Sequence, residues 1–303
     1  MLKVHLATIV GRVYLWTFSH VQRFLLRRWG WQDTSLRRMA RKLKQFFEPL
    51  LATTLPNPVE VSGLAIYWLP SACWYIRNFI AGTFEENSVR IFKSLLRPGA
   101  TVLDLGAHIG LYSLLAAQIV GPEGRVYAFE PDPTVFPVLI RNITANGFAQ
   151  IIHAEQKAVG NTEGSVKFYL SSTQQGYSSI YPAGIKNAQC IEVQMTTLDS
   201  FLASQGWPLV DVIKMDIEGS EPLAFQGMKE TAHRNTHLKM IVEFNVSRFG
   251  RGLEKALSSF AGLESLGFAH FYFLWEREPK KLIIPRDIPW LLNQPVYNIL
   301  CTK

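Results

Sequence analysis

Residues 101–120, TVLDLGAHIGLYSLLAAQIV, predict a strand, a glycine turn and a helix in direct succession. The apolar run TVLDLGA (101–107) ends in an acid and a glycine. GLYSLLAAQIV (110–120) then has the apolar spacing of a helix, which stops at Gly121-Pro122. Glycine at such a turn lets the backbone bend tightly and lets a ligand approach the chain. The segment therefore predicts the first strand–helix unit of a ligand-binding α/β sheet.

Strands and helices continue to alternate downstream, which predicts parallel βαβ units. Further core strands are expected at GRVYAFEP (124–131), IIHAEQKAV (151–159), DVIKMDIEG (211–219) and KMIVEFN (239–245). HFYFLWE (270–276) and VYNILCT (296–302) are expected to form an antiparallel pair. SVKFYL (165–170) and IEVQMTTL (191–198) are expected to extend the sheet. The predicted fold class is α/β and Rossmann-like: a mostly parallel seven-stranded sheet, helices on both faces, an antiparallel C-terminal strand pair and a helical N-terminal extension.

Positive charge is concentrated at the N-terminus. The formal net charge is +7, yet residues 1–50 carry ten Lys or Arg and two acids, which leaves the rest of the chain close to neutral. A neutral body argues against a broad nucleic-acid groove, because such a groove needs clustered positive charge. Three zones are expected: a basic amphipathic helical extension (1–50), a connector with a short strand or hairpin (51–80) and the α/β domain (81–303).

The basic extension suits either a membrane surface or a cap on the main domain. SLRRMARKLKQFFEPL (35–50) has apolar residues at helical spacing with basic residues largely elsewhere, and residues 12–28 are similar but more apolar. Basic amphipathic helices bind membrane surfaces or anionic partners. The same helices could instead dock their apolar side on the domain, form a lid over substrate entry, or mediate dimer contact. Peripheral membrane contact through residues 1–50 is one of these alternatives, and the oligomeric state is left open.

The cysteines and the hydropathy of the chain indicate the cellular compartment to expect. Cys73, Cys190 and Cys301 are widely spaced in apolar contexts, which predicts buried free thiols in a reducing environment. No CxxC pair is present, so a thiolate zinc site is not expected. No apolar run reaches the roughly 18 to 20 residues that span a bilayer. The expected location is therefore cytoplasmic, with peripheral membrane attachment as the alternative.

The turn after the first strand carries acids that suit a nucleoside with a positive amino group. Asp104 precedes Gly106, and Gly110 opens the helix, but position 108 is His where the GxGxxG pattern of nicotinamide binding has its middle glycine. Glu130 ends the next strand, 20 residues after Gly110. A carboxylate at that point can accept both hydroxyls of an adenosine ribose. The turn and the two acids together predict a nucleoside-binding site.

The sequence resembles the class I methyltransferases that use S-adenosyl-L-methionine (SAM) and, more narrowly, the FkbM-type family. The resemblance covers roughly residues 60–245, and its most specific part is IKMDIEGSE, within VDVIKMDIEGSEPLAFQGM (210–228). The other segments that carry it are GTFEENSVRIFKSLLRPGATVLDLGAHIGLYSLLAA (82–117), VYAFEPDPTVFPVLIRNITANG (126–147), KAVGNTEGSVKFY (157–169) and TTLDSFL (196–202). The resemblance implies that residues 81–303 form a SAM-dependent methyltransferase domain.

The resemblance also implies roles for individual residues. Asp104, Gly106 and Gly110 would form the SAM turn. Glu130 would bind the ribose, and Glu85, in GTFEE, would reach the methionine amino group. The full set of expected cofactor-binding residues is Glu85, Asp104, Gly106, Ala107, His108, Gly110, Glu130, Pro131, Ala158 and Asp216.

Three carboxylates crowd the end of the strand at 211–219. Asp216, Glu218 and Glu221 lie at the sheet edge where open α/β folds bind ligands, and they are the catalytic candidates. Methyl transfer to oxygen requires removal of the hydroxyl proton, for which a carboxylate can serve as general base. Glu218 is the first choice for acceptor contact or base, and Asp216 is expected to touch the cofactor or the reacting centre. Glu221 has an ordinary alternative as an acid in the first turn of a helix.

A metal site is the less favoured interpretation of this edge. Glu243 and Asn245 end the next core strand and could join Asp216 as oxygen ligands for Mg²⁺. The prediction is that no metal is bound. The polar segment 171–189, with Tyr177 and Tyr181, is expected either to shape the acceptor pocket or to form a plain hairpin loop.

The predicted function is SAM-dependent methyl transfer to a hydroxyl of a small molecule, sugar or lipid-like acceptor, with no nucleic-acid partner. One alternative is an NAD-dependent oxidoreductase on a similar fold, which the missing middle glycine disfavours. The other is a non-catalytic, membrane-associated module that binds SAM. The residues do not identify the acceptor.

Overall fold

The computed structural model describes residues 55–171, 178–182, 188–245, 253–274, 278–294 and 296–303. The chain divides into two compact units, with the boundary between Glu86 and Asn87. The helices expected within residues 1–50 lie outside the described residues, and so does Tyr177. Among the helices that the structure describes, none is long and apolar enough to cross a membrane.

The described part of the first unit is a hairpin followed by helical turns. β1 (Val59–Val61) pairs antiparallel with β2 (Leu64–Ile66). The short 3₁₀ helix η1 (Pro70–Ala72) leads directly into α3 (Cys73–Ile80). Apolar side chains of the hairpin and of α3 are buried, so even this short segment has its own apolar interior.

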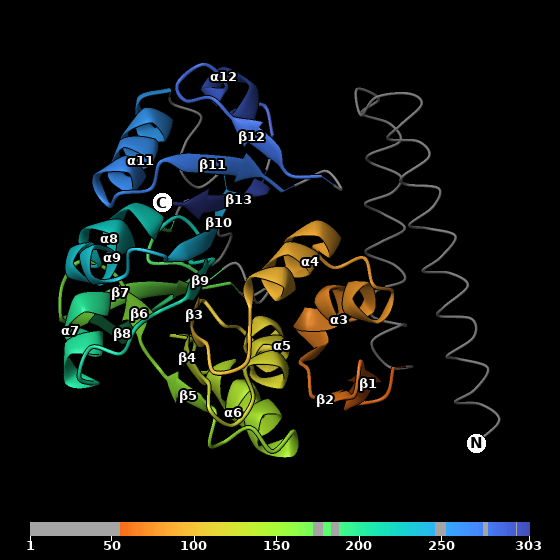
Figure 1. Ribbon diagram of the computed structural model, residues 1–303. Helices are drawn as coiled ribbons and strands as arrows, with labels where there is room; N and C mark the ends of the chain where they lie inside the picture. Colours follow the sequence, from red (N-terminus) through yellow and green to blue (C-terminus); the bar gives the residue numbers. More distant parts are fainter. Residues whose placement is uncertain (1–54, 172–177, 183–187, 246–252, 275–277, 295) are drawn as a thin grey trace. The chain divides into compact units, whose positions relative to one another are not determined.

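The second unit is built on an eight-stranded sheet of order β12-β11-β13-β10-β9-β3-β4-β5 (Figure 1). Its parallel strands are β3 (Thr101–Leu105), β4 (Arg125–Phe129), β5 (Ile152–Glu155), β9 (Val212–Met215) and β10 (Lys239–Asn245). Its antiparallel end contains β13 (Val296–Thr302), β11 (His270–Phe273) and β12 (Lys280–Leu282). This arrangement confirms the Rossmann-like class and the antiparallel C-terminal pair. The eighth strand, β12, has the sequence KKL with both lysines exposed, too short and polar a segment to predict a strand.

A second, three-stranded sheet corrects one expectation. β7 (Gly164–Leu170) and β8 (Gln189–Thr196) do not extend the main sheet; they pair with each other, and β8 pairs with β6 (Ala158–Val159). The single strand expected at 151–159 is accordingly two strands, β5 and β6, in different sheets. Alternating side chains predict a half-buried strand, but they do not specify the strand with which it pairs.

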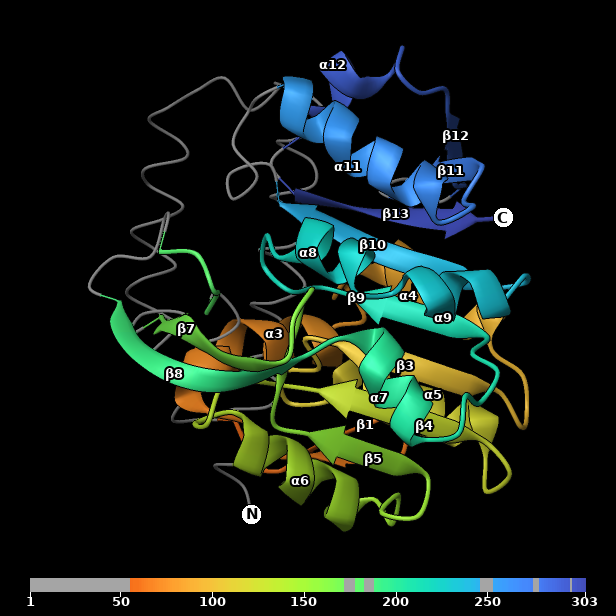
Figure 2. The same cartoon turned by 90° about the vertical axis from the view of Figure 1, so that its left-hand side faces the viewer.

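Helices cover both faces of the main sheet. Figure 2 shows α7 (Leu198–Ser204), α8 (Glu221–Gln226), α9 (Lys229–Arg234) and α11 (Leu253–Ser265) in front of it and α5 (Leu111–Val120) behind it. The remaining helices are α6 (Phe136–Ala145), α12 (Ile288–Leu291) and α4 (Glu86–Leu95), whose first residue is the last of the first unit. Helices therefore follow β3, β4, β9 and β10, as the alternation predicts, whereas β5 leads into the strand β6.

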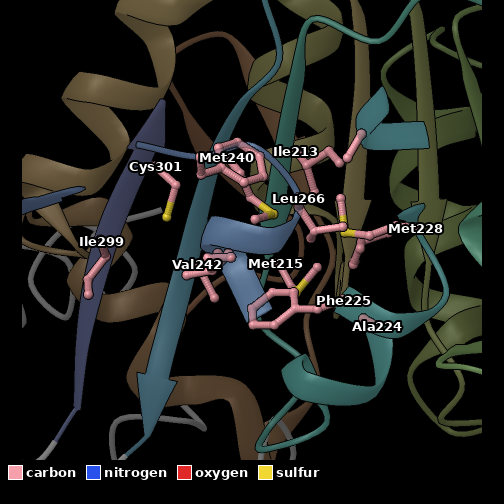
Figure 3. Close-up of a cluster of buried hydrophobic side chains, with 14 of the residues drawn as sticks. Ile213, Met215, Ala224, Phe225, Met228, Met240, Val242, Leu266, Ile299 and Cys301 are labelled. Atoms are coloured by element: carbon pink, nitrogen blue, oxygen red, sulfur yellow. The ribbon is translucent and has the colours of Figure 1, made fainter. Parts of the chain in front are cut away.

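Strand alternation decides which side chain reaches which face. In β9, Ile213 and Met215 pack toward α8, as Figure 3 shows, and all four residues of the strand are buried. Lys214 points to the opposite face with only 1% of its side chain exposed. A strand buried on both faces is typical of a parallel sheet, but a lysine inside it is exceptional.

One of the three cysteines is not buried, contrary to the expectation from the sequence. Cys73, Cys190 and Cys301 are free thiols, as predicted, and Cys73 and Cys301 are buried. Cys190 is exposed, because β8 turns that side chain toward solvent.

Candidate functional site

The turn after β3 requires glycine at two positions. Gly106 has a φ of +82°, and a Cβ atom there would lie 1.9 Å from the carbonyl oxygen of Asp216. Gly110 has a φ of +92°, and its Cβ would lie 2.6 Å from Cδ1 of Leu139. The positive φ and the lack of space for a Cβ atom therefore both require glycine at these two positions. The turn brings the end of β3 directly against the end of β9.

His108 lies between the two glycines and shares their left-handed backbone, with a φ of +52°. Its backbone N–H donates a 2.8 Å hydrogen bond to Oε2 of Glu130. Burial lowers the pKa of the imidazole to about 4, against the charges of Asp132 and Asp216, which raise it. The side chain is therefore neutral at physiological pH.

Glu130, at the end of β4, is held by two backbone donors. The N–H of Asp132 donates to Oε1 at 2.8 Å, and the N–H of His108 donates to Oε2 at 2.8 Å. Burial raises the pKa of this carboxyl to about 8, although both hydrogen bonds lower it. In the ionised form each carboxylate oxygen has two lone pairs, so both can then still accept a ribose hydroxyl.

Asp104 lies inside the layer between the sheet and α5. It is 2% exposed and accepts a 2.6 Å hydrogen bond from Oγ of Ser113. It is the register partner of Lys214 on the neighbouring strand. Burial raises the pKa of Asp104 to about 6, while Ser113 and the charge of Lys214 lower it. Asp104 is therefore a buried support beneath the glycine turn.

Lys214 connects this buried layer to Asp216. Its Nζ lies 3.6 Å from Oδ2 of Asp216 and donates a 3.3 Å hydrogen bond to Oδ1 of Asn298. It also lies 5.1 Å from the ring centroid of Tyr112. The side chain of Asp216 is 30% exposed, so its carboxylate is the more accessible end of the pair.

Glu218 follows Asp216 in a second left-handed turn, with a φ of +52°. It is 8% exposed, and its Oε2 accepts a 3.1 Å hydrogen bond from Nδ2 of Asn245. Its backbone carbonyl accepts a 2.8 Å hydrogen bond from Oγ of Ser179. The carboxylate and the main chain of Glu218 are thus each held by a separate segment.

Glu221 closes the same turn from the first position of α8. Its Oε1 accepts hydrogen bonds from the N–H groups of Ile217 (3.2 Å) and Gly219 (3.3 Å). It is 1% exposed, and its Oε2 is buried without a hydrogen-bond partner among the described residues. Burial raises the pKa of Glu221 to about 7, and the charge of Asp216 raises it further. This geometry suits a residue that shapes the turn.

Two of the three residues considered for Mg²⁺ come together. A carboxylate oxygen of Asp216 lies within 4.8 Å of one of Glu243. Asn245 donates a hydrogen bond from its amide nitrogen to Glu218, whereas a metal ion would be bound by its amide oxygen, so this hydrogen bond does not exclude Asn245 as a ligand. The structure therefore brings the carboxylates of Asp216 and Glu243 together, and a metal contact of Asn245 stays a hypothesis.

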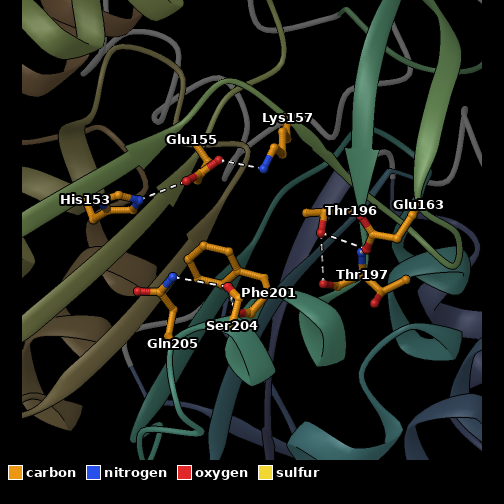
Figure 4. Close-up of polar contacts among 9 residues, drawn as sticks. All are labelled: His153, Glu155, Lys157, Glu163, Thr196, Thr197, Phe201, Ser204 and Gln205. Carbon is orange, nitrogen blue, oxygen red and sulfur yellow. Dashed lines mark hydrogen bonds and ion pairs between the residues drawn. The ribbon is translucent and has the colours of Figure 1, made fainter.

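The edge beyond β5 is built around Glu155. Figure 4 shows this carboxylate between His153 and Lys157, at 2.8 Å and 2.9 Å. Burial opposes the shift, but the hydrogen bonds from Lys157 and His153 together lower the pKa of Glu155. Ala158 follows directly in β6 and is 6% exposed. Its contact with the cofactor stays a prediction.

Most of the predicted site residues therefore gather at the carboxyl ends of β3, β4 and β9. Those around the glycine turn and the strand ends are Asp104, Gly106, Ala107, His108, Gly110, Glu130, Pro131, Asp216 and Glu218. Glu85 belongs to the first unit, and its role stays a prediction. Lys214 and Ser179 were not predicted. A lysine within an apolar strand was a usable signal, whereas Ser179 reaches Glu218 across 39 residues of sequence.

Comparison with known proteins gives a family match. The family model described as the methyltransferase FkbM domain matches residues 104–270, more than half of the chain. The chain is 28% identical over 163 residues to the 31-O-demethyl-FK506 methyltransferase FkbM of Streptomyces tacrolimicus, covering 45% of this chain and 62% of that protein. It is 26% identical over 158 residues to methyltransferase sdnD of Sordaria araneosa, covering 43% and 60%. The chain thus spans about 60% of the length of these curated relatives.

Two of the solved structures that match this chain do so at low sequence identity. The METTL16 MTase domain has a TM-score of 0.46 at 12% identity, covering 80% of this chain and 73% of that chain. Aeropyrum pernix fibrillarin in complex with SAM has a TM-score of 0.40 at 13% identity, covering 72% and 74%. The match to the family over residues 104–270 confirms the resemblance and the SAM cofactor expected from the sequence: the chain belongs to the FkbM family of SAM-dependent methyltransferases.

Proposed function

We propose that this protein transfers a methyl group from SAM to a hydroxyl of a small, uncharged acceptor, such as an alcohol, a sugar or a lipid-like molecule. The observation that carries the proposal is Glu218, a buried carboxylate in the turn that also holds Asp216. Asn245 orients this carboxylate through a 3.1 Å hydrogen bond. A carboxylate held in this way can act as a general base.

The side chains around the glycine turn suit SAM. Glu130 offers two fixed oxygens for the ribose hydroxyls, and Asp216 offers a partly exposed carboxylate for the amino group. When bound, SAM supplies a methyl group that is activated by a positively charged sulfur. The protein then has to orient the acceptor and exclude water, which are effects that need no further chemical group.

Glu218 would take the proton of the acceptor hydroxyl. Transfer of the activated methyl group to the acceptor oxygen would release the hydroxyl proton, and a carboxylate oxygen of Glu218 would accept it. Glu218 is 8% exposed, so little water competes for that proton. Asp216 would face the cofactor with Lys214 behind it, and Glu221 would hold the turn between them.

The charge at this edge favours an uncharged acceptor. Asp132, Asp216, Glu218 and Glu243 place carboxyl groups at neighbouring strand ends, so an acceptor carrying phosphate or carboxylate would be repelled. This argues against a nucleic-acid substrate, whose backbone is anionic. The relative named 31-O-demethyl-FK506 methyltransferase acts, by its name, on an O-demethylated compound, which supports a hydroxyl as acceptor.

Isotope transfer tests the proposal. The full chain is incubated with SAM labelled in its methyl group and a panel of uncharged alcohols, sugars and lactones, and labelled products are identified by mass spectrometry. We expect a labelled O-methyl product and S-adenosylhomocysteine in equal amounts. SAM binding by calorimetry without turnover on any acceptor would favour the non-catalytic module. Bound nicotinamide, visible by its absorbance, would favour the oxidoreductase.

The catalytic role is tested by Glu218→Gln. We expect turnover to fall at least a hundredfold while the dissociation constant for SAM stays within twofold, because the carboxylate is assigned to the acceptor proton. Glu264→Gln removes an exposed acid on α11 and serves as the control. Unchanged turnover in Glu218→Gln would transfer the role of base to another group.

A second candidate function is methyl transfer assisted by Mg²⁺. Carboxylate oxygens of Asp216 and Glu243 lie within 4.8 Å of each other, and such oxygens suit this ion. We expect EDTA to leave turnover unchanged, because the proposed mechanism assigns the acceptor proton to Glu218 and needs no metal. Turnover that is lost on chelation and restored by Mg²⁺ would instead assign the two acids to a metal.

A further inference from the structure

We propose that Ser179 and Asn245 are positioning residues, which hold the Glu218 turn in a strained conformation and so present its carboxylate to the acceptor. The inference rests on the proposed function, because it assigns Glu218 the acceptor proton. It goes beyond that function by naming the two side chains that make this carboxylate usable.

The strain is visible in the backbone. Glu218 has a φ of +52°, a left-handed conformation that side chains other than Gly, Asn and Asp adopt only uncommonly. The next residue, Gly219, also has a positive φ, of +97°, as is ordinary for glycine. Backbone strain of this kind persists where the surrounding structure enforces it. The question is therefore which contacts enforce it at Glu218.

Ser179 holds the main chain of Glu218. Its Oγ donates to the Glu218 carbonyl at 2.8 Å and accepts from the N–H of Tyr181 at 3.1 Å. Its own backbone is fixed by two hydrogen bonds with Tyr169, of 2.8 Å and 3.1 Å. Ser179 is 1% exposed, so water does not offer an alternative partner there. The hydroxyl therefore connects β7 to the turn after β9.

Asn245 holds the side chain of the same residue. It lies at the end of β10, is 4% exposed, and donates from Nδ2 to Oε2 of Glu218 at 3.1 Å. A hydrogen bond to a buried carboxylate contributes more than one between neutral groups. Two segments that are distant in sequence thus fix the carbonyl and the carboxylate of one residue.

The adjacent Ser178 reaches the other half of the site. Its Oγ donates to Oδ2 of Asp132 at 3.0 Å, and the N–H of Asp132 in turn donates to Glu130. The serine pair therefore connects the ends of β4 and β9, between the acid assigned to the ribose and the acid assigned to the acceptor. This location is where a positioning element would act on the reaction geometry.

The strain can be measured without an acceptor. Glu218→Gly and Glu218→Ala lose the same carboxylate but differ in their tolerance of a positive φ. We expect the glycine variant to melt about 2–4 °C above the alanine variant. An alanine variant as stable as the glycine variant would overturn the inference, because the turn would then be unstrained in solution. This result is independent of the proposed function.

The positioning role is measured with the uncharged acceptor that the wild type methylates fastest. For Ser179→Ala we expect kcat to fall at least tenfold, with KM for the acceptor and the SAM dissociation constant within twofold, and we expect Ser179→Thr to recover part of kcat. Asn245→Leu, similar in size but without the donor, should behave like Ser179→Ala. Ser265→Ala, which removes a 2.7 Å serine-to-carbonyl hydrogen bond on α11, is the matched control.

Unchanged kcat in both Ser179→Ala and Asn245→Leu would overturn the inference. So would a parallel loss of kcat and of SAM affinity, because that pattern indicates general damage to the fold. If the wild type methylates no acceptor of the panel, the proposed function fails, while the comparison of Glu218→Gly with Glu218→Ala still decides whether the turn is strained.

Discussion

The ammonium of Lys214 lies 3.6 Å from the carboxylate of Asp216, although Lys214 is 1% exposed in the middle of a parallel sheet. Burying a charge costs free energy unless partners compensate for it. Asp216, Asn298 and the ring of Tyr112 are such partners, and the charge of Lys214 also lowers the pKa of Asp104. The charge of Lys214 thus opposes the rise in the pKa of Asp104 that burial causes.

Replacing this cation should make SAM binding more sensitive to pH. Lys214→Met retains the aliphatic stem but removes the charge, so the pKa of Asp104 should rise from its present value of about 6. We expect the ratio of SAM affinity at pH 8 to that at pH 6 to increase at least threefold, measured by calorimetry. Lys239→Met, at an exposed lysine on β10, is the control. Equal ratios in wild type and Lys214→Met would show that Lys214 does not control the titration of Asp104.

The ribose acid gives the most direct test of the cofactor site. Glu130→Ala should weaken SAM binding at least tenfold, or about 1.4 kcal/mol, because both oxygens that are fixed by His108 and Asp132 disappear. Glu123→Ala removes an exposed acid near the start of β4 and should leave the affinity unchanged. Calorimetry that gives equal affinities for wild type and Glu130→Ala would refute the assignment.

Glycine can be required by a positive φ or by the lack of space for a Cβ atom, and two substitutions separate these effects. Gly106→Ala should lower the free energy of unfolding by more than about 2 kcal/mol, because its Cβ would lie 1.9 Å from a backbone oxygen and its φ is +82°. Gly206 has a φ of +77° but nothing within 4 Å of a Cβ, so Gly206→Ala should lose only about 1 kcal/mol. Urea unfolding measures both. Equal losses would contradict the close approach of Gly106 to Asp216.

The buried acids should make stability fall as pH rises. Burial raises the pKa of Glu221 from 4.5 to about 7, so the folded state binds the proton more tightly than the unfolded chain does. Its contribution to stability is then fully present below pH 4.5 and is lost as pH rises through about 7. Glu221→Gln removes this titration. We expect a smaller decline in unfolding free energy between pH 4.5 and 7.5 than in wild type, and identical declines would contradict the expectation.

The role of the basic residues 1–50, as a membrane contact or as a cap on the domain, stays a prediction that truncation can test. Each Lys or Arg near an anionic membrane contributes about 1 kcal/mol, an attraction that salt screens. If residues 1–50 bind lipid, the full chain should sediment with anionic liposomes at low salt but not at high salt, and the truncated chain at neither. If they cap the domain, deletion should lower the melting temperature, and the full chain should not bind liposomes.

Local patterns were sufficient for the elements near the glycine turn. The spacing of Asp104, Gly106 and Gly110 predicted a tight turn, and Gly106 does have the left-handed φ that such a turn requires. The acids Glu130 and Glu218 were predicted because each follows a strand whose carboxyl end lies at the ligand edge of a parallel sheet. These inferences depend on order along the chain, which the sequence contains in full.

By itself, the sequence determined the α/β class, the succession of core strands along the chain, the glycine turn and the position of the acids at strand ends, since all of these follow from periodicity and spacing. Only the tertiary structure decided that β7 and β8 form a separate sheet with β6, that Asp104 lies buried beside Lys214, and that Ser179 and Asn245 hold Glu218. Pairing between strands and hydrogen bonds between distant segments depend on which surfaces meet in space. A contact such as that between Ser179 and Glu218, 39 residues apart, leaves no periodic pattern along the chain.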